Sequence, residues 1–507
     1  MTEGGLRLRT AGYSAYVLRR ALFSQTLATL SIVLTVGATG AACDMDGTGI
    51  RSNEQGEGGG ANGGSDSPSF TGEGGTIVNP GSEAGASDGS VTDAVSSSIE
   101  AASDDAALPR GPTPATAGVN FPFPQNRQSS NCIYPSRYLN SDVQAAYAKW
   151  TSDTVTSAGA GVGTRVQRLA SDPTNEGTLP VGSTVSEGIG YGMLIAVYMG
   201  DQTLFDGLWK YEQQQLDVNG LMNWSVGPDG TMNTNGAGGA TDADEDMAFA
   251  LVMADKQWGG QGSLSQTYAT YALKQIKAIW ANEIWNYQVV IPGDQWNGDD
   301  GSTVNISYFA PAYYRVFATL DPVGSLTGDN WSMAIDSAYS IIGLALNATN
   351  GNRTNGLVPA WCSSAGGAPG PGQPTNYQYD SCRTPFRIGL DWCWNAEPRA
   401  QQYVALTSAF FNGIGAANIT DGYQTNGSAD PGYTAMAGEL SAAFIGPAGV
   451  GAMGGAMSSS TYQPFVNGAY NEVATLQLLA AGTYYEDSWT VMSLLMMSAN
   501  FLDYTRY

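Results

Sequence analysis

The sequence of 507 residues contains no histidine at all. This absence excludes a Ser-His-Asp triad, a Cys-His pair and any metal site with a histidine ligand. Any catalysis must therefore use carboxylate, tyrosine, lysine or arginine side chains. Basic residues are also scarce, because 21 Lys and Arg stand against 45 Asp and Glu, which gives a net charge of −24. A chain this acidic is not expected to bind nucleic acid or an anionic membrane surface.

Cysteine is rare as well, and the chain has no CxxC spacing. Apart from Cys43, the cysteines are Cys132, Cys362, Cys382 and Cys393. In an exported protein, four cysteines allow two disulfides in three connectivities. Cys362 and Cys382 flank a Gly/Pro-rich loop, so their pairing is one hypothesis. A Cys382–Cys393 pair and four free thiols are the alternatives.

Large apolar residues are few in residues 44–118, which are rich in Gly, Ser and Asp. Such a segment cannot bury enough surface to offset the entropy lost on ordering, so we predict a flexible linker. Residues 1–43 show the pattern of an export signal, in which four arginines precede a mostly apolar stretch that ends in small residues. The stretch is also long enough for an uncleaved membrane anchor. Cys43 ends a loose lipoprotein motif, so we expect a secreted or surface-tethered protein with one folded domain over residues 119–507.

Strand-like alternation is rare beyond residue 118, and its best example is YQVVIP at residues 287–292. Helical spacing of apolar residues is common instead. Twelve helices are predicted to begin near Ser141, Ser186, Gln202, Asp242, Ser263, Tyr308, Asp329, Thr384, Pro398, Tyr433, Pro464 and Asp487. Long Gly/Asn/Ser-rich loops separate alternate helices, which favours paired helices with the loops on one face. No repeat indicates a solenoid, so we predict an all-α barrel of helix pairs.

Four carboxylates crowd into five positions ahead of an apolar helix pattern: Asp242, Asp244, Glu245 and Asp246. The spacing begins like an EF-hand calcium loop, but the sixth position holds Met247 instead of Gly and the twelfth holds Met253 instead of Glu. No metal site is therefore predicted. A capped helix is the simplest explanation, with Thr241 as the N-cap and Asp244 completing a capping box. Capping leaves Asp242 unexplained, which makes it a candidate catalytic residue.

Two further carboxylates lie in settings that suit acid–base catalysis. Glu187 begins a helix in SEGIGYG, where no cation is near it in the sequence, and such surroundings favour the protonated form that a general acid needs. Asp380 follows Tyr379 in a loop, with Arg383 and Arg387 after it, and a nearby arginine favours the ionised form that a general base needs. The alternatives are an acidic first-turn residue for Glu187 and a structural salt bridge for Asp380.

Several of these segments together resemble glycoside hydrolase family 8. ATDADEDMAFALVMADKQWG is similar to the signature helix of that family, SEGIGYGMLIAV to its acid-bearing segment and YDSCRTPFRI to its base-bearing segment. NISYFAPAYYRVFA, GLMNW and GDQWNG are also similar to family segments, and the segments occur in the family's order. The resemblance spans roughly residues 122–504, which is essentially the whole folded part.

The resemblance implies an (α/α)6 barrel with a substrate cleft across one end, and inverting hydrolysis of a β-1,4-linked glycan. Glu187 matches the family's proton donor, Asp380 matches its base, and Asp242 matches the residue that holds the distorted sugar at the cleavage subsite. The implied substrate-binding residues are Trp224 and Trp296 as stacking platforms, Tyr308 and Arg383 as residues that orient the base and its water, and Tyr379 and Tyr484 as further contacts. Two departures are Ile306, where the family usually has Pro, and Ala481, where its glucanases commonly have a sugar-contacting Tyr.

Two facing carboxyl groups, one protonated and one ionised, perform inverting glycoside hydrolysis and are expected to stand roughly 6.5–9.5 Å apart. This chemistry needs no metal or organic cofactor and no obligatory protein partner, so we expect a monomer without cofactors. Cellulose or mixed-linkage β-glucan is the expected substrate. The alternatives are chitosan, a polycation that an acidic protein attracts, xylan, and a non-catalytic role in glycan binding.

Overall fold

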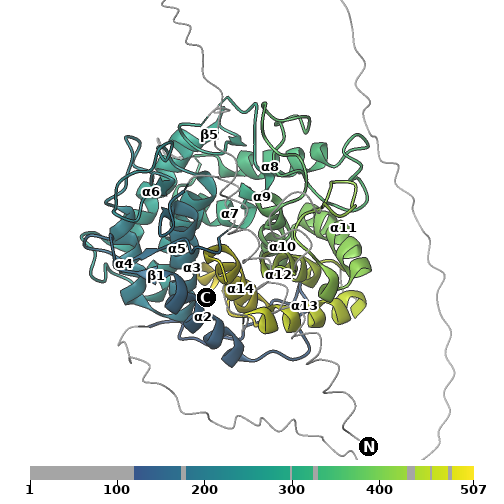
Figure 1. Ribbon diagram of the computed structural model, residues 1–507, viewed down its shortest axis with the longest axis horizontal. Coiled ribbons are helices and arrows are strands. Elements are labelled where there is room, and N and C mark those ends of the chain that lie inside the picture. Colours follow the sequence, from purple (N-terminus) through teal and green to yellow (C-terminus); the bar gives the residue numbers. More distant parts are fainter. Residues whose placement is uncertain are drawn as a thin grey trace, which may run out of the picture. The chain divides into compact units, whose positions relative to one another are not determined.

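Figure 1 shows the computed structural model of the chain, which describes residues 119–172, 179–296, 300–323, 329–430, 440–456, 460–477 and 482–507. The predicted export signal (1–43) and linker (44–118) lie outside the described residues. Helices dominate the part that is described, and each strand there is two residues long. The all-α class predicted from the sequence is therefore confirmed.

Twelve long helices are present among the described residues. In chain order they are α2 (Asn140–Thr154), α3 (Ser186–Met199), α4 (Gln202–Glu212), α5 (Thr241–Gln257), α6 (Tyr268–Glu283), α7 (Pro311–Leu320), α8 (Trp331–Ala345), α10 (Thr384–Asn395), α11 (Pro398–Ile414), α12 (Ala442–Met453), α13 (Gln463–Leu476) and α14 (Tyr484–Met497). The shorter turns are the α-helical turn α9 (Tyr379–Cys382) and the 3-10 turns η1 (Ile306–Tyr308), η2 (Ala416–Asn418), η3 (Ser460–Tyr462) and η4 (Tyr504–Arg506).

Six short strands in the described part of the chain form three antiparallel pairs. The pairs are β1 (Val155–Thr156) with β2 (Arg165–Val166), β3 (Thr184–Val185) with β4 (Ser225–Val226), and β5 (Ile284–Trp285) with β6 (Val289–Val290). The strand predicted at residues 287–292 is thus present but reduced to β6. These pairs tie loops together and do not form a layer of their own.

Six helices form a closed inner ring, in which each helix contacts the next. The order around the ring is α3, α5, α7, α10, α12 and α14, and α14 closes the ring against α3 (Figure 1). The other six, α2, α4, α6, α8, α11 and α13, pack outside against the inner helices. Inner and outer helices alternate along the chain, which is the arrangement of an (α/α)6 barrel, as predicted.

The inner and outer helices differ in which residues they bury. All twelve residues of α12, AAFIGPAGVGAM, are buried, because a helix enclosed on every side needs small or apolar residues around its whole circumference. The outer helix α4 buries one stripe, which includes Leu204, Leu208 and Trp209. Small residues also set the spacing of the inner helices, since a Cβ on Gly190 of α3 would lie only 3.0 Å from the Asp246 Cβ of α5. Glycine at this position therefore lets α3 approach α5 closely.

Two helices begin later than the sequence pattern predicts. The helix expected near Ser263 begins at Tyr268, because the side chain of Thr267 accepts a backbone hydrogen bond and caps the helix there. The helix expected near Tyr433, a residue outside the described part of the chain, begins at Ala442. The other predicted starts lie within a turn of the observed ones.

The cysteines differ from all three arrangements considered from the sequence, the two pairings and the four free thiols. Cys132 forms a disulfide with Cys393, 261 residues away, while Cys362 and Cys382 are free and buried. The segment that carries Cys132 lies across the end of α10, where the side chain of Asn131 donates to the Cys393 carbonyl at 3.2 Å. The predicted pairs Cys362–Cys382 and Cys382–Cys393 are therefore wrong, because the distance between Cα atoms in the fold, and not the loop length, decides which thiols meet.

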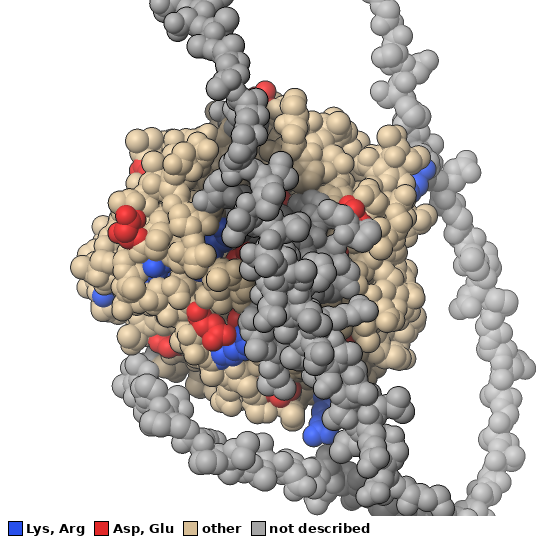
Figure 2. Space-filling model, in the orientation of Figure 1, with Lys and Arg blue, Asp and Glu red and all other residues tan. Residues whose placement is uncertain are grey.

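The helices of the described ranges and the face in Figure 2 bear on membrane and nucleic-acid binding. No helix in the described ranges has both the length and the apolar character needed to cross a bilayer. Figure 2 shows that Lys and Arg side chains are few and scattered over the described part of the face it presents. That part of the surface offers no basic patch of the kind that binds nucleic acid.

Candidate active site

The three predicted catalytic carboxylates lie at helix starts that meet at one end of the barrel. Glu187 is in the first turn of α3 and Asp242 in the first turn of α5, while Asp380 lies in α9, directly before α10. Antiparallel pairing with the outer helices makes successive inner helices run the same way. Their N-terminal ends, and the loops that lead into them, therefore gather together.

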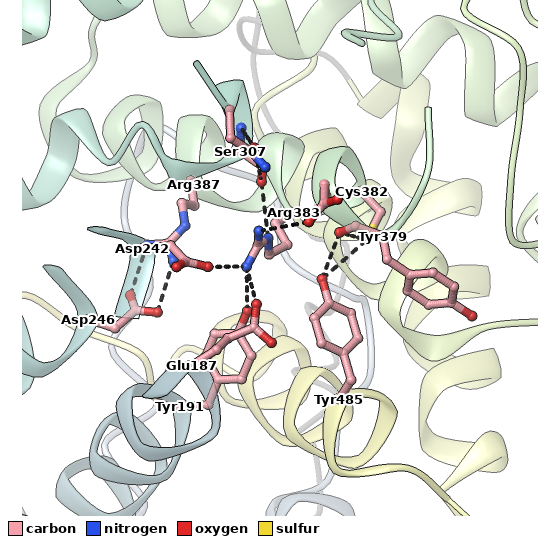
Figure 3. Close-up of polar contacts among 12 residues, drawn as sticks. Glu187, Tyr191, Asp242, Asp246, Ser307, Tyr379, Cys382, Arg383, Arg387 and Tyr485 are labelled. Carbon is pink, nitrogen blue, oxygen red and sulfur yellow. Dashed lines mark hydrogen bonds and ion pairs between the residues drawn. The ribbon is translucent and has the colours of Figure 1, made fainter. Parts of the chain in front are cut away.

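Arg383 lies at the centre of this group and is buried between two carboxylates (Figure 3). Its Nη1 donates to Glu187 Oε2, to Asp242 Oδ2 and, at 3.0 Å, to the hydroxyl oxygen of Tyr191. Its Nε donates to Ser307 Oγ at 3.1 Å. Arg383 and Glu187 are 196 residues apart in the sequence. Glu187 therefore has a cation beside it in the fold, although none is near it in the sequence.

Sharing one cation between two carboxylates changes the charge balance around Glu187. Arg383 alone would favour the ionised form of Glu187, which is the wrong form for a general acid. Asp242 contacts the same guanidinium group, and its negative charge offsets part of that effect at Glu187. The other oxygen of Glu187, Oε1, accepts a hydrogen bond from the Tyr484 hydroxyl at 2.8 Å. Tyr484 therefore lies beside the predicted acid.

Asp380 is the most exposed of the three carboxylates. Its side chain is 37% accessible, against 17% for Glu187 and 2% for Asp242, and this exposure gives the predicted base access to water. Its Oδ1 lies 3.9 Å from Arg383 Nη2, so Arg383 contacts the predicted acid more closely than the base. Asp380 and Glu187 face the same guanidinium group from different nitrogens. That arrangement is compatible with the roughly 6.5–9.5 Å between the carboxyl groups of inverting enzymes.

Two side chains that the sequence analysis missed contact the other oxygen of Asp380. Oδ2 accepts hydrogen bonds from Gln378 Nε2 at 2.8 Å and from Trp361 Nε1 at 3.1 Å. Gln378 lies two residues before Asp380, so a local pattern, an amide side chain at the start of a helical turn, marks it. Nothing local marks Trp361, because it lies 19 residues before Asp380 in the long connection between α8 and α9.

Four aromatic side chains form a continuous row that ends beside Arg383. Ring centroids are 6.0 Å apart for Trp224 and Trp296, 6.3 Å for Trp296 and Trp361, and 6.2 Å for Trp361 and Tyr308. The Tyr308 ring in turn lies 5.1 Å from the guanidinium carbon of Arg383. Trp224 and Trp296 are partly exposed, whereas Trp361 and Tyr308 are buried. The two predicted platforms are therefore neighbours, and both are accessible.

Tyr379 points away from Arg383 (Figure 3). Its hydroxyl donates to Asp421 Oδ2 at 3.2 Å, and its ring packs against Phe444 and Tyr485 at 5.2 and 5.6 Å between centroids. The hydroxyl of Tyr485 donates to the backbone carbonyl of Tyr379 at 2.8 Å. These contacts hold the α9 turn, which carries the predicted base, against α14 and α12. A contact between Tyr379 and substrate stays a prediction.

Asp244 does not cap α5, contrary to the prediction. The helix begins without a side-chain cap, and the Thr241 hydroxyl donates to the Ile291 carbonyl at 2.6 Å instead. Asp244 is buried and accepts a hydrogen bond from Gln275 Nε2 at 2.9 Å. Burial, together with the nearby carboxyl of Glu212, raises the pKa of Asp244 well above its usual range. The neighbouring helices enclose this first turn, so its acids face protein and not solvent.

The remaining acids of this region differ in their hydrogen-bond partners. Asp246 accepts a bidentate pair of hydrogen bonds from Arg387 at 2.8 and 2.9 Å. Glu245 accepts one from the Tyr314 hydroxyl at 2.6 Å, and burial raises its pKa well above the usual range. Burial has the same effect on the pKa of Glu283 in α6. Within the described ranges, no three His, Cys, Asp or Glu side chains are arranged to hold a metal ion.

The stability of the protein is expected to fall as the pH rises toward 8. Burial raises the pKa of Glu212 from an ordinary value of 4.5 to about 8, and it raises those of Glu486 and Asp172 to about 7 and about 6. Between the ordinary and the raised values, the folded protein holds protons that the unfolded chain has released. The contribution of these groups to the free energy of unfolding is therefore complete below their ordinary pKa and is lost as the pH passes the raised one.

Thermal melts at a series of pH values between about 5 and 9 measure this loss. Glu212→Gln is the informative variant, because its amide oxygen can still accept the hydrogen bond from Gln213 but cannot ionise. Its melting temperature is expected to decline less over this range than that of the wild type. Parallel declines in the two proteins would show that Glu212 does not titrate in this window.

The chain matches one protein family over most of its length. The family model of Glycosyl hydrolases family 8 matches residues 122–499, a range that contains all of the predicted site residues. The chain is 37% identical over 395 residues to Endoglucanase 2 of Ruminiclostridium josui, covering 76% of this chain and 78% of that protein. It is also 37% identical over 393 residues to Endoglucanase A of Acetivibrio thermocellus, covering 77% and 76%.

The fold of the chain is similar to that of a solved glucanase structure. The apo structure of the β-1,3-1,4-glucanase from Paenibacillus sp. X4 matches with a TM-score of 0.62 and 28% sequence identity. The match covers 75% of this chain and 98% of that one. The similarity therefore extends over nearly the whole of the known glucanase.

Proposed function

Because the chain belongs to glycoside hydrolase family 8 and is a glycosidase of the endoglucanase type, we propose that it cleaves the β-1,4 bonds of cellulose or mixed-linkage β-glucan with inversion. One observation carries the proposed mechanism. Glu187 and Asp380 face a single buried guanidinium group, that of Arg383, and a row of tryptophan rings leads to it. In this proposal Glu187 is the acid, Asp380 is the base, and the tryptophan row is the sugar-binding surface beside them.

The proposed reaction is a single displacement at the anomeric carbon. Protonated Glu187 gives its proton to the glycosidic oxygen as the bond from that oxygen to the anomeric carbon breaks. Ionised Asp380 takes a proton from a water molecule, whose oxygen forms a bond to the opposite face of the same carbon. One water is consumed, and Glu187 ends ionised while Asp380 ends protonated. Exchange of protons with solvent restores both groups.

The remaining site residues bind and orient the sugar in this proposal. Trp224 and Trp296 are partly exposed, and tryptophan rings suit the apolar faces of β-linked glucose units. Asp242 binds hydroxyl groups of the distorted sugar at the cleavage point. Because Asp242 also contacts Arg383, it supports Glu187 as an acid by sharing the cation that would otherwise favour the glutamate anion.

The substrate is tested by measuring the reducing ends released from carboxymethylcellulose, mixed-linkage β-glucan, xylan and chitosan under the same conditions. The two glucans are expected to give the fastest release. Faster release from chitosan would indicate that the negative charge of the protein selects a polycation. Faster release from xylan would replace the glucanase assignment by the second alternative, and no release from any polymer would favour a glycan-binding role.

The first product of hydrolysis is expected to be the α-anomer. A single attack by water on the face opposite the leaving group converts a β-linkage into an α-hemiacetal, and no covalent glycosyl-enzyme forms. Proton NMR during the first minutes, before mutarotation equalises the anomers, distinguishes the two outcomes. Appearance of the β-anomer first, or mass spectrometry of an ester on either carboxylate, would contradict the inverting mechanism.

We also propose that the protein acts outside the cell as a monomer. The support is the export-signal pattern of residues 1–43 and the linker composition of residues 44–118, which suit a catalytic domain released or held at some distance from the cell surface. Cell fractionation with an antibody to the barrel tests the location, and labelling with palmitate tests a lipid on Cys43. Recovery of the protein in the cytosol would reject the proposed location. Light scattering measures the oligomeric state.

A further inference from the structure

We propose that Trp361 and Gln378 position the base, holding Oδ2 of Asp380 so that Oδ1 is the atom that takes the proton from water; this inference rests on the proposed function. Oδ2 accepts hydrogen bonds from Trp361 Nε1 at 3.1 Å and from Gln378 Nε2 at 2.8 Å. The described residues direct no hydrogen bond to Oδ1, and its nearest cation, Arg383 Nη2, is 3.9 Å away. One oxygen of the base is therefore fixed, and the other is left for water.

Both donors are themselves held in place. Gln378 is 1% exposed, and its Oε1 accepts the backbone N–H of Asp380 at 2.8 Å, so one amide group binds the backbone and the side chain of the base together. Trp361 is 6% exposed, and the residue after it, Cys362, exchanges two backbone hydrogen bonds with Val304. Rigid donors give the carboxylate one orientation, which proton transfer from a water on one side of the sugar requires.

Trp361 also connects the base with the proposed sugar platform. Its ring lies 6.3 Å from that of Trp296, with an angle of 27° between the ring planes, and 6.2 Å from that of Tyr308. The N–H edge of Trp361 therefore holds Asp380 while the rest of the ring borders Trp296. This contact fixes the base relative to a sugar stacked on Trp296.

The charged and titratable groups that face Asp380 determine the charge around its carboxylate. The charged and titratable ones are Arg383, Tyr308 and Cys382. Burial raises the pKa of the Tyr308 hydroxyl and of the Cys382 thiol well above their usual values, so both stay neutral over the working pH range. Arg383 supplies the positive charge, and the two neutral N–H groups add hydrogen bonds that favour the ionised form of the base. Loss of either donor is expected to disfavour that form.

Trp361→Phe tests the proposal, because it keeps an aromatic ring and removes only the N–H donor. We expect kcat on β-glucan to fall about tenfold to a hundredfold, with a much smaller change in KM. The acidic limb of the pH–rate profile is expected to move toward higher pH, because a hydrogen bond to the carboxylate is lost. Gln378→Glu keeps the acceptor for the Asp380 amide but replaces the donor with a like charge, so we expect a larger shift in the same direction.

Trp150→Phe is the matched control. Trp150 lies on the outer helix α2, and its buried indole Nε1 donates a hydrogen bond to Ser488 Oγ at 3.0 Å. Loss of this donor is expected to lower the melting temperature without moving the acidic limb of the pH–rate profile. A Trp361→Phe or Gln378→Glu enzyme that folds and keeps the wild-type acidic limb, or that changes KM alone, would overturn the positioning role. Failure of the proposed function would look different, because the wild type itself would then not hydrolyse β-glucan.

Discussion

Glu187→Gln is expected to reduce the hydrolysis of β-glucan by about 10²–10⁴-fold. The natural leaving group is a poor alkoxide, and the variant has no proton to give it. The amide keeps the shape of the carboxyl group, and its oxygen can still accept a hydrogen bond from Arg383 or Tyr484. An aryl β-cellobioside with an acidic phenol departs without a proton, so its hydrolysis is expected to fall much less.

Initial rates on the two substrates, together with a thermal melt, measure this difference. Glu472→Gln is a suitable control, because Glu472 is partly exposed on the outer helix α13, and it is expected to keep wild-type rates on both. Equal losses on both substrates in Glu187→Gln would leave inversion intact but would remove Glu187 from the role of acid.

Asp380→Asn is expected to reduce hydrolysis of both substrates alike, by about 10²–10⁴-fold. Water must be activated whichever group departs, so a better leaving group does not compensate for a missing base. The amide of the variant can keep an oxygen toward Trp361 and Gln378, so the local structure is expected to persist. The contrast between the two substrates therefore separates the base from the acid.

The control for this variant is Asp336→Asn, because Asp336 is 70% exposed and pairs with Arg399 at the surface. It is expected to behave like the wild type, since exposed ion pairs contribute little to stability. Azide needs no base, so its addition to Asp380→Ala is expected to restore turnover of the aryl substrate and to yield a glycosyl azide of inverted configuration. An Asp380→Asn enzyme that keeps its rate on the aryl substrate would exclude Asp380 as the base.

Local signals made the helices predictable from the sequence alone, and they also marked the candidate catalytic carboxylates. The helices α3, α4, α10 and α11 begin at the predicted residues, because apolar spacing and starting residues act within a few turns of one helix. Glu187, Asp242 and Asp380 each lie in a contiguous motif, so short stretches of sequence identify them. The composition alone also removed every mechanism that needs histidine.

Only the tertiary structure decided which side chains meet across the barrel. Arg383 contacts Glu187 although 196 residues separate them, and Cys132 pairs with Cys393 across 261. The contact of Trp361 with Asp380 spans a shorter separation of 19 residues, within the long connection between α8 and α10. These partners have no local signal, because closure of the ring brings the starts of the inner helices together whatever their separation along the chain.

Asp244 is the clearest case in which a local sequence pattern predicts the wrong contact. Its position in the sequence fits a helix cap, and in an isolated helix that hydrogen bond would form. In the barrel, α5 is enclosed by its neighbours α3, α6 and α7, and the side chain turns to Gln275 instead. Apolar spacing and motif order thus decided where each helix and each candidate carboxylate lies along the chain. The hydrogen-bond partner of each buried polar group depended on which helix faces it after the ring closes. Burial makes an unsatisfied polar group costly, and the facing helix supplies the partner.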